Sequence, residues 1–335
     1  MAQRTLQRAG LTGLGMSFPE RVLTNADFEK MVDTNDAWIV ERTGIRERRV
    51  VEKGTPASHH GALAARDALA HAGIDPADLD LLLVPTVTPD MTFPATACVI
   101  QKLIGADHAW GFDIEAACSG FIYALETARA YVESGLVRNA LVVGTEIMSM
   151  ITDYTDRNTC ILFGDGAGAV AVQPVDPADG GIIDAVNHMD GMGIQFLHQK
   201  AGGSRMPPSA ETVANKLHYV YQEGREVYKH AVRGMANVAL EIVERNNLDP
   251  SDVKLLVPHQ ANIRIIEAAQ KRLGLADEQV SITIDRYGNT TSASIPSALK
   301  VAYDAGRVKR GDHVVLVSFG AGFTWGASLI RWCID

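Results

Sequence analysis

Short, nearly uninterrupted apolar runs alternate with segments of helical periodicity along most of the chain. In the first half, this pattern predicts strands at 79–84, 111–114 and 140–144, helices near 57–72, 94–104 and 119–134, and a further buried strand from Phe163. In the second half, it predicts strands at 253–257, 280–284 and 313–318, and helices near 224–246, 262–273 and 292–305. Such runs separated by helices are typical of an α/β protein with largely parallel sheets covered on both faces.

The two halves of this pattern resemble each other. Asp75-Pro76 and Asp249-Pro250 open similar segments 174 positions apart, and the later segments 134–144 and 305–320 match at 171 positions. Chance similarity of strand–loop–helix units is the alternative, but two matches in the same order favour a duplication. We therefore expect two like halves, 1–180 and 181–335, within one compact unit.

Cys118 is the first candidate for chemistry. It lies where a short apolar strand meets the helix near 119–134, between small residues that would leave its sulfur accessible. The positive end of a helix dipole favours the thiolate, which is the nucleophilic form. A lone cysteine is more often a buried structural residue, so Cys118 alone decides nothing.

Two polar residues at similar strand–helix junctions favour a catalytic role for Cys118 over a structural one. His259 follows the strand at 253–257, just before a helix that Asn262 could cap, and Asn289 precedes the helix near 292–305. A separation of 171 places Asn289 at the position that Cys118 holds in the first half. Catalytic groups of α/β proteins often lie beyond the carboxyl ends of strands, so a thiol, an imidazole and a carboxamide together predict an active site.

The composition narrows the class of protein. The 335 residues are 47% hydrophobic and 21% charged, which is ordinary for a globular protein, and the net charge of −9 argues against general nucleic-acid binding. No apolar run reaches the roughly 18 residues that span a bilayer. The four cysteines have no metal-site spacing, and the first ten residues lack the apolar core of a secretory signal. We expect a cytoplasmic protein with free thiols, no membrane segment and no bound metal.

Six motifs resemble those of the thiolase superfamily, and within it the β-ketoacyl-[acyl-carrier-protein] synthase III family. They are NDAWIVERTGIRERR (35–49), EAACSGF (115–121), DRNTCILFGDGAGA (156–169), VPHQANIRII (257–266), YGNTTSASIP (287–296) and SFGAGFTWG (318–326). The resemblance runs from about Leu11 to Trp332. It implies a five-layered αβαβα fold of two duplicated halves, a homodimer, and the initiating condensation of bacterial fatty-acid synthesis.

The resemblance also implies a role for each matching residue. Cys118 would carry the acyl group, and His259 and Asn289 would hydrogen-bond the malonyl thioester. The other implied positions are Trp38 and Arg157 around the adenine of coenzyme A (CoA), Arg42 near its phosphate, Asn262 in the same site, Phe319 and Ala321 at the departing carboxylate and the oxyanion hole, and Phe93 and Leu162 at the acyl pocket.

The implied substrates are an acyl-CoA, such as acetyl-CoA, and malonyl-carrier-protein, with no resident cofactor. Because such carrier proteins are acidic, the basic residues Arg264, Lys271 and Arg272 on the helix after His259 are the candidate docking surface, although a solvated helix flank is the alternative. The Gly-, Pro- and Met-rich stretch 185–222 is expected to be irregular and to shape the substrate cavity or a subunit contact. The alternatives for function are a condensing enzyme of secondary metabolism (alkylquinolone or polyketide starter), a non-catalytic acyl-CoA-binding protein and a cysteine hydrolase.

Overall fold

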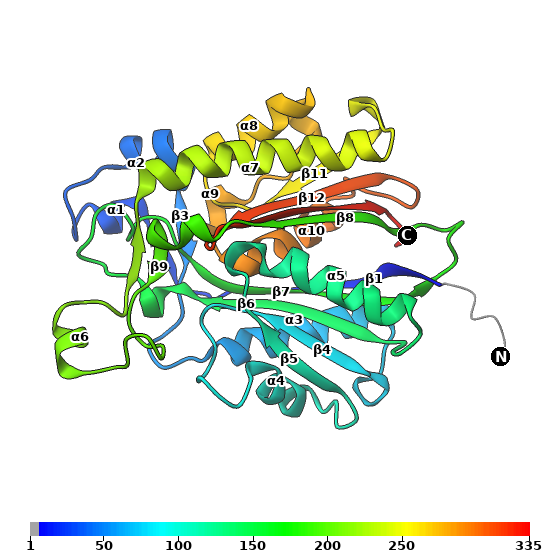
Figure 1. The fold of residues 1–335 in the computed structure, drawn as a ribbon, viewed down its shortest axis with the longest axis horizontal. Helices are drawn as coiled ribbons and strands as arrows, with labels where there is room; N and C mark the ends of the chain where they lie inside the picture. Colours follow the sequence, from blue (N-terminus) through cyan, green and yellow to red (C-terminus); the bar gives the residue numbers. More distant parts are fainter. Residues whose placement is uncertain (1–6) are drawn as a thin grey trace.

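The molecule is built of five layers, in which two β-sheets alternate with three layers of helices (Figure 1). The computed structural model describes residues 7–335. The first six residues, on which the signal-sequence prediction partly rests, lie outside the described part of the chain. The two described ends of the chain lie at the same end of the molecule (Figure 1).

The first sheet contains five strands in the order β1-β7-β6-β4-β5. Their bounds are β1 (Arg8–Ser17), β4 (Leu81–Pro85), β5 (Trp110–Ile114), β6 (Ala140–Ile147) and β7 (Asp165–Val175). Strand β4 pairs in parallel with β5 and β6, whereas β7 pairs antiparallel with β6 and β1. This sheet is therefore mixed, because β7 runs antiparallel between β1 and β6 while the other four strands run in one direction.

The second sheet contains four strands in the order β11-β12-β13-β8. Their bounds are β8 (Gly181–Met189), β11 (Val253–Pro258), β12 (His313–Gly320) and β13 (Thr324–Arg331). Only β11 and β12 are parallel; β12–β13 and β13–β8 are antiparallel. Two small ribbons lie outside both sheets and are formed by β2 (Val22–Thr24) with β3 (Glu47–Arg49) and by β9 (Leu197–Gln199) with β10 (Val220–Gln222).

The helices form one central layer and two outer layers. Helices α5 (Gly120–Glu133) and α10 (Ser294–Asp304) lie between the sheets, α3 (Ala57–Ala72) and α4 (Thr96–Ile104) cover the first sheet, and α7 (Gly224–Arg245) and α8 (Ile263–Leu273) cover the second (Figure 1). Four short helices lie at the periphery: α1 (Asn25–Phe28), α2 (Asp36–Thr43), α6 (Ala210–Ala214) and α9 (Ile284–Tyr287).

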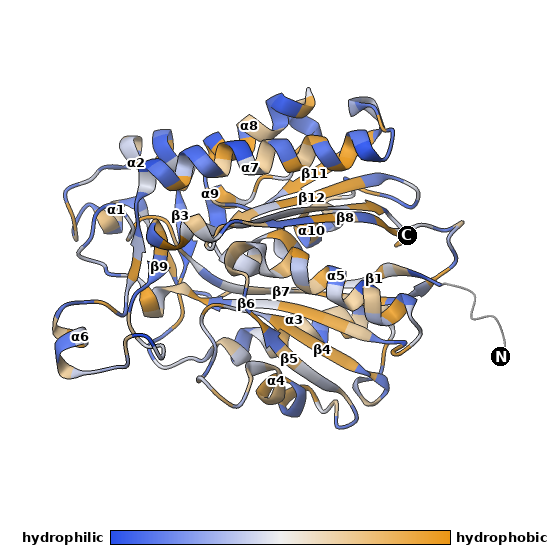
Figure 2. Cartoon of the chain, in the orientation of Figure 1, coloured by the Kyte–Doolittle hydropathy of each residue, from blue (hydrophilic) through white to orange (hydrophobic). Residues whose placement is uncertain are grey.

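The layers enclose three hydrophobic cores. The central core joins both sheets to α5 and α10, one outer core lies under α3 and α4, and the other lies under α7 and α8. The apolar residues are concentrated in the strands and on the inner sides of the helices (Figure 2). Burial on both faces explains why the central strands read as continuous apolar runs.

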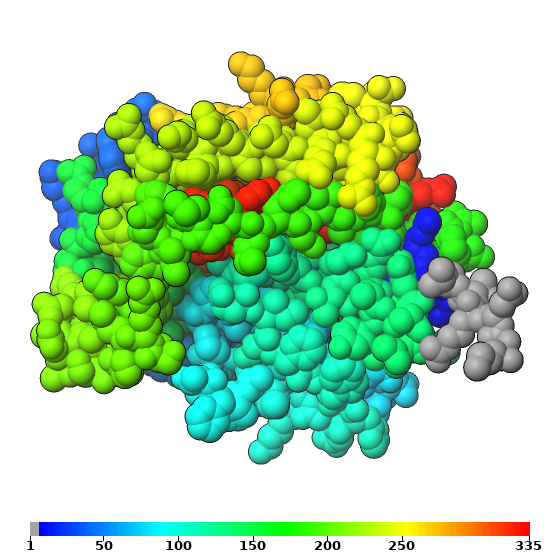
Figure 3. Space-filling view, viewed as in Figure 1, coloured from blue at the N-terminus to red at the C-terminus, as the bar shows by residue number. Residues whose placement is uncertain are grey.

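Two predicted segments differ from the structure. Residues 280–284 do not form a strand: Val280 makes only an isolated bridge with Leu256, and α9 begins at Ile284. The stretch 185–222 is more regular than expected, since it contains most of β8, the β9–β10 ribbon and α6. Its later part bulges at one end of the molecule (Figure 3). None of the helices within residues 7–335 is both long and apolar enough to span a bilayer.

The structure also corrects the predicted counterpart of Cys118. Residues Ala117–Ser119 form a single 3-10 turn, η2, and Thr291–Ala293 form the corresponding turn, η7. Each turn begins at a non-glycine residue with left-handed φ (47° at Ala117, 45° at Thr291) and leads into a central helix. Cys118 therefore corresponds to Ser292, not to Asn289. The first residues of α5 and α10 are 174 positions apart in the sequence, and their last residues are 171 apart, because α10 is three residues shorter than α5.

Candidate active site

Cys118 is held at the centre of the molecule by contacts with the second sheet. Its carbonyl accepts a hydrogen bond from Ser318 Oγ of β12 at 2.7 Å. Ser119 Oγ donates to Thr324 O, and Thr324 Oγ1 donates to Ala116 O, both at 3.0 Å. These bonds fix the turn that presents the thiol at the amino end of α5, the position that the sequence predicts.

The thiol itself does not have the pKa that its place on a helix suggests. Burial raises the pKa of Cys118 well above its usual value, and the charge of buried Glu146 raises it further. The helix end was expected to favour the thiolate, but burial and Glu146 both favour the neutral thiol in the site without substrate.

His259 lies at the carboxyl end of β11 and is buried. Its backbone N–H donates to Val317 O of β12 at 2.8 Å, so the imidazole is anchored one residue from the serine that holds Cys118. Ser294 Oγ, at the first position of α10, lies 2.7 Å from Nδ1.

The environment of His259 fixes its protonation state. Ser294 Oγ accepts from Gln260 N–H at 3.4 Å, so its own hydrogen is available for His259 Nδ1. When Ser294 Oγ–H donates to Nδ1, the hydrogen of the neutral ring lies on Nε2. Burial lowers the pKa of His259 to about 3, so the imidazole is neutral near pH 7 and can act as a hydrogen-bond donor.

Asn289 is buried in the segment between α9 and the η7 turn. Its backbone N–H donates to Leu162 O at 2.9 Å, and its carbonyl accepts from Gly164 N–H at 3.0 Å. Its side-chain Oδ1 accepts from Thr291 N–H at 2.9 Å. Because this bond uses the oxygen, the amide nitrogen is the end left to donate elsewhere.

The end of β12 and the loop after it pack against Cys118. A Cβ added at Gly320 would lie 2.7 Å from Cys118 N, so the two backbones are in close contact. Ala321 follows with φ outside the left-handed range, and its Cβ therefore causes no backbone strain there. Phe319 is buried, and its ring packs 4.9 Å from that of Phe323 and against Gly234 of α7.

The residues expected to bind CoA form a second cluster. The guanidinium carbons of Arg42 and Arg157 each lie 5.3 Å from the centre of the Trp38 ring. Arg157 also pairs with Asp33 at 3.3 Å. Asn262 caps α8 and donates to Arg42 O at 2.8 Å, which ties this cluster to the helix that follows His259.

The remaining predicted site residues are more dispersed. Leu162 is half-buried and adjoins Asn289, but Phe93 is 83% exposed. Arg264, Lys271 and Arg272 are exposed on α8, and Arg264 pairs with Glu41 of α2 at 3.4 Å. Hydrogen bonds thus connect Cys118 and His259 to β12, and His259 and Asn289 to the start of α10 and the turn before it, whereas Phe93 is exposed.

Sequence reasoning missed the hydroxyl groups and the carboxyl group behind the site. Ser318 holds Cys118, Ser294 holds His259, and Ser292 contacts Glu146 at 2.7 Å. The signal for Glu146 was its position inside a buried apolar run, where an ionisable residue is rare. The serines carried no such signal, because their partners are distant in the sequence.

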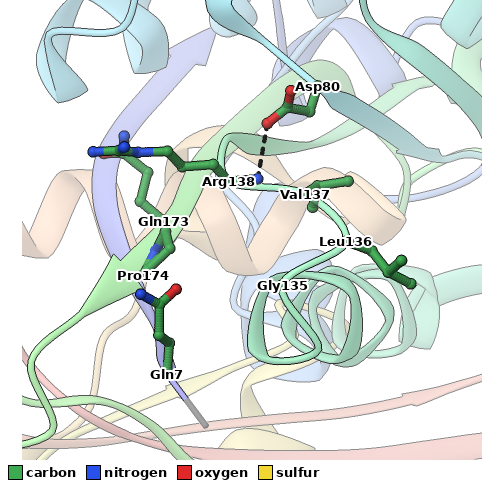
Figure 4. A pocket seen from close by; sticks show the side chains of 8 residues that line it. All are labelled: Gln7, Asp80, Gly135, Leu136, Val137, Arg138, Gln173 and Pro174. Atoms are coloured by element: carbon green, nitrogen blue, oxygen red, sulfur yellow. Dashed lines mark hydrogen bonds between the residues drawn. The ribbon is translucent and has the colours of Figure 1, made fainter. Parts of the chain in front are cut away.

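A separate surface pocket lies at the other end of the first sheet (Figure 4). It is lined by residues before β4, before β6 and at the end of β7, including Asp80, Arg138 and Gln173. Cys118 follows the carboxyl end of β5, which is parallel to β4. The pocket at the amino ends of these strands therefore does not belong to the active site.

Comparison with known proteins identifies the family. The models for 3-oxoacyl-[acyl-carrier-protein] synthase III and for its C-terminal part match residues 112–191 and 243–332. The chain is 52% identical to the β-ketoacyl-[acyl-carrier-protein] synthase III of Solibacter usitatus over 98% of this chain and 99% of the relative.

Solved structures agree with this assignment. The synthase III of Thermus thermophilus has 47% identity and a TM-score of 0.90, over 96% of this chain and 99% of the other. A priming β-ketosynthase of a polyketide biosynthetic pathway has 36% identity and a TM-score of 0.90, over 99% of each chain. The chain therefore belongs to the β-ketoacyl-[acyl-carrier-protein] synthase III family, the acyltransferases that carry out the initiating condensation of fatty-acid synthesis.

Proposed function

We propose that this enzyme condenses an acyl-CoA primer with malonyl-carrier-protein to give 3-oxoacyl-carrier-protein, CoA and CO₂, through an acyl group carried on Cys118. The observation that carries the proposal is a chain of hydrogen bonds around the three residues. Cys118 and His259 are both held on strand β12, through Ser318 and Val317. His259 and Asn289 are bound to the start of α10 and to the turn before it, through Ser294 and Thr291. A neutral imidazole and a carboxamide are both donors, which suits a reaction that develops negative charge on a thioester oxygen.

The first half-reaction transfers the acyl group. Cys118 Sγ attacks the thioester carbonyl, and the sulfur–carbon bond to CoA breaks. The proton that Cys118 loses balances the one that the departing CoA thiolate gains. The N–H groups of Cys118 and Ala321 flank the position where the carbonyl oxygen would become negative, as supported by the close approach of Gly320 to Cys118 N.

The second half-reaction forms the carbon–carbon bond. Loss of CO₂ from the malonyl group leaves an enolate, whose oxygen His259 Nε2–H and the Asn289 amide would stabilise. The enolate carbon attacks the acyl carbonyl on Cys118, and the thiolate of Cys118 leaves. Asparagine suits this role because it donates without charge, whereas an aspartate at 289 would repel the enolate.

Trp38, Arg42, Arg157 and Asn262 are the proposed CoA site. Stacking an adenine between Trp38 and Arg157 needs two contacts of about 3.5 Å each. The observed 5.3 Å from the guanidinium carbon to the ring centre is shorter than their sum. Binding therefore requires Arg157 to move, and its exposed pair with Asp33 is a weak restraint.

The carrier protein would dock on α8 through Arg264, Lys271 and Arg272. Arg264 and Lys271 are seven residues apart and share one face of that helix. Since the net charge is −9, attraction of an acidic partner must come from such a local surface.

A homodimer is the proposed assembly. Strand β5 is an edge of the first sheet, and Trp110 on it is 48% exposed. An unpaired edge with exposed aromatic residues favours pairing with a second copy. Phe93, with 83% exposure, would then close the acyl pocket of the neighbouring subunit, and Leu162 would line the pocket of its own. Light scattering in solution tests this assembly.

The remaining expectations belong to the same proposal. The reaction needs no resident cofactor, because acyl-CoA and malonyl-carrier-protein are both substrates. We also propose a cytoplasmic location and a boundary between the two halves near residue 180. A polyketide-starter role is the second candidate, favoured by the 36% identity to the priming β-ketosynthase.

Intact-protein mass spectrometry tests the proposed reaction. Wild-type enzyme and Cys118→Ser are incubated with a panel of acyl-CoAs and then with malonyl-carrier-protein. A gain of one acyl group on the wild type alone, discharged as a 3-oxoacyl product, supports the proposal and identifies the primer. Discharge only by another acceptor favours the polyketide-starter role, and no acylation contradicts the nucleophile assignment.

A further inference from the structure

A buried carboxyl group that the reaction scheme does not use joins three segments around the active site. Glu146, in β6, is fully buried. Its Oε2 accepts from Thr88 Oγ1 at 2.7 Å and from Thr86 Oγ1 at 3.3 Å, and Val87 N–H contacts both carboxyl oxygens. Its Oε1 lies 2.7 Å from Ser292 Oγ. The carboxyl thus connects β6, the loop after β4 and the η7 turn.

Counting hydrogens at Ser292 indicates which form of the carboxyl completes this network. Ser292 Oγ lies 2.7 Å from Glu146 Oε1 and 2.9 Å from Pro85 O, and both of these atoms are acceptors when the carboxyl is ionised. A hydroxyl has only one hydrogen. With a proton on Oε1, Glu146 donates to Ser292 and Ser292 donates to Pro85, so both contacts become hydrogen bonds.

Ser292 is linked in turn to the carboxamide of Asn289. The residue before it, Thr291, has a φ of 45°, which is unfavourable for a β-branched residue and persists only when its surroundings hold it. In this conformation Thr291 N–H donates to Asn289 Oδ1 at 2.9 Å. That bond decides which end of the carboxamide is free to donate.

We propose that Glu146, in its carboxylic acid form, is a positioning residue that acts through Ser292 and the Thr291 turn to aim the Asn289 amide at the thioester oxygen. This inference rests on the proposed role of Asn289 in condensation. It gives the geometry that the η7 turn shares with the η2 turn a role in condensation.

Burial favours the uncharged form of Glu146, whereas the donors around it favour the carboxylate, so the group can change its charge near neutral pH. The groups that face it are the hydroxyls of Thr86, Thr88, Thr291 and Ser292 and the Val87 N–H, and the titratable group that interacts with it is the Cys118 thiol. Burial raises the pKa of Glu146 to about 6. Ionisation of Glu146 would also oppose the Cys118 thiolate, so the acid form suits both half-reactions.

The experiment measures the two half-reactions separately in single turnovers. Ser292→Ala removes the link without changing a charge. We expect it to slow the discharge of acyl-Cys118 by malonyl-carrier-protein at least about tenfold, a fraction of the loss typical of deleting an oxyanion donor. Acylation of Cys118 by acyl-CoA should stay within about twofold of wild type.

Glu146→Gln is the conservative variant that mimics the acid form, because its amide can donate to Ser292 and accept from Thr88. We expect it to retain condensation within about threefold. In wild type, condensation should fall as the pH rises from about 5 to about 8, across the Glu146 pKa of about 6. In Glu146→Gln this dependence should be absent.

Asp165→Asn is the matched control. Asp165 is also a fully buried carboxyl, but its side chain is held by Val51 N–H and by Ser149, and none of these bonds reaches Thr291 or Ser292. Asp165→Asn should therefore change the rates of acylation and of condensation by the same factor. A Ser292→Ala enzyme that condenses at the wild-type rate, a Glu146→Gln enzyme that does not, or a wild-type profile without the decline would each overturn the inference. Full condensation by Asn289→Ala would instead overturn the proposed role of Asn289 itself.

Discussion

Cys118 and Ser292 occupy equivalent positions in the two halves of the molecule. Each is the second residue of a 3-10 turn that begins with a left-handed residue and leads into a central helix, and the two turns contact each other. In one half this position carries the proposed nucleophile, Cys118. In the other half it carries the hydroxyl of Ser292, which contacts Glu146. The two copies of the turn therefore contribute different side chains to the same region.

The contact between Gly320 and Cys118 leads to the first prediction. In Gly320→Ala, the new Cβ would lie 2.7 Å from Cys118 N and 3.2 Å from Cys118 Cβ, so the turn or the loop must shift. We expect both half-reactions to slow at least about tenfold, since overpacking of this kind costs about 1–3 kcal/mol. Rapid-quench assays of acylation and of condensation measure this. Gly203→Ala, where a Cβ meets nothing within 4 Å, is the control. Acylation at the wild-type rate in Gly320→Ala would refute the close contact.

Ser294 sets the tautomer of His259 and gives the second prediction. In Ser294→Ala, Nδ1 loses its partner at 2.7 Å, and the hydrogen is no longer confined to Nε2. We expect condensation to fall about tenfold while acylation changes little, because only condensation uses the Nε2–H donor. ¹⁵N NMR of the His259 ring checks the tautomer directly. If Ser294→Ala still shows only the Nε2–H tautomer and condenses at the wild-type rate, the role assigned to Ser294 is contradicted.

The third prediction concerns stability and pH. Burial lowers the pKa of His259 from 6.5 to about 3, so the unfolded state binds the proton more tightly between these values. The neutral imidazole therefore contributes stability above pH 6.5 that is lost as the pH falls toward 3. We expect a loss of about 2 kcal/mol from this group between pH 6.5 and about pH 5. Urea unfolding of wild type and His259→Gln over this range measures it, and parallel curves for the two proteins would contradict the burial of a neutral ring.

The basic face of α8 gives the fourth prediction. Arg264→Glu with Lys271→Glu should raise KM for malonyl-carrier-protein at least about tenfold at low salt, because the docking charge is reversed. KM for acyl-CoA should be unchanged. Lys102→Glu with Arg138→Glu changes the net charge equally but lies on other exposed segments, and it serves as the control. Equal effects of the two pairs would show that net charge, not docking on α8, is responsible.

The proposed catalytic trio could be selected from the sequence because each member has a local signal. Cys118 and His259 each follow a strand and precede a helix, as predicted, and Asn289 precedes the turn into α10, although the apolar run before it is not a strand. The antiparallel strands were harder: β1 and β13 were not predicted, and β8 was hidden in a stretch interpreted as irregular. Residues 280–284 have the apolar content of a strand, but only Val280 finds a strand partner.

The groups that orient the trio were not predictable. Glu146 meets partners 58 to 146 positions away, and Ser294 meets His259 across 35. Such contacts depend on how the layers pack and leave no periodic signal in the chain. The pKa of Cys118 illustrates the same limit: its place on a helix was predicted, but its burial and its neighbour Glu146 reverse the expected effect.

The most direct test of the central claim is the single-turnover discharge of acyl-Cys118 in Asn289→Ala. The account predicts that this variant is acylated at the wild-type rate and that its condensation falls about 100- to 1,000-fold, because one donor to the enolate oxygen is lost. Both values come from one experiment that follows the enzyme-bound acyl group and the 3-oxoacyl product. Equal loss of acylation, or discharge at the wild-type rate, would contradict the division of labour between Cys118 and Asn289.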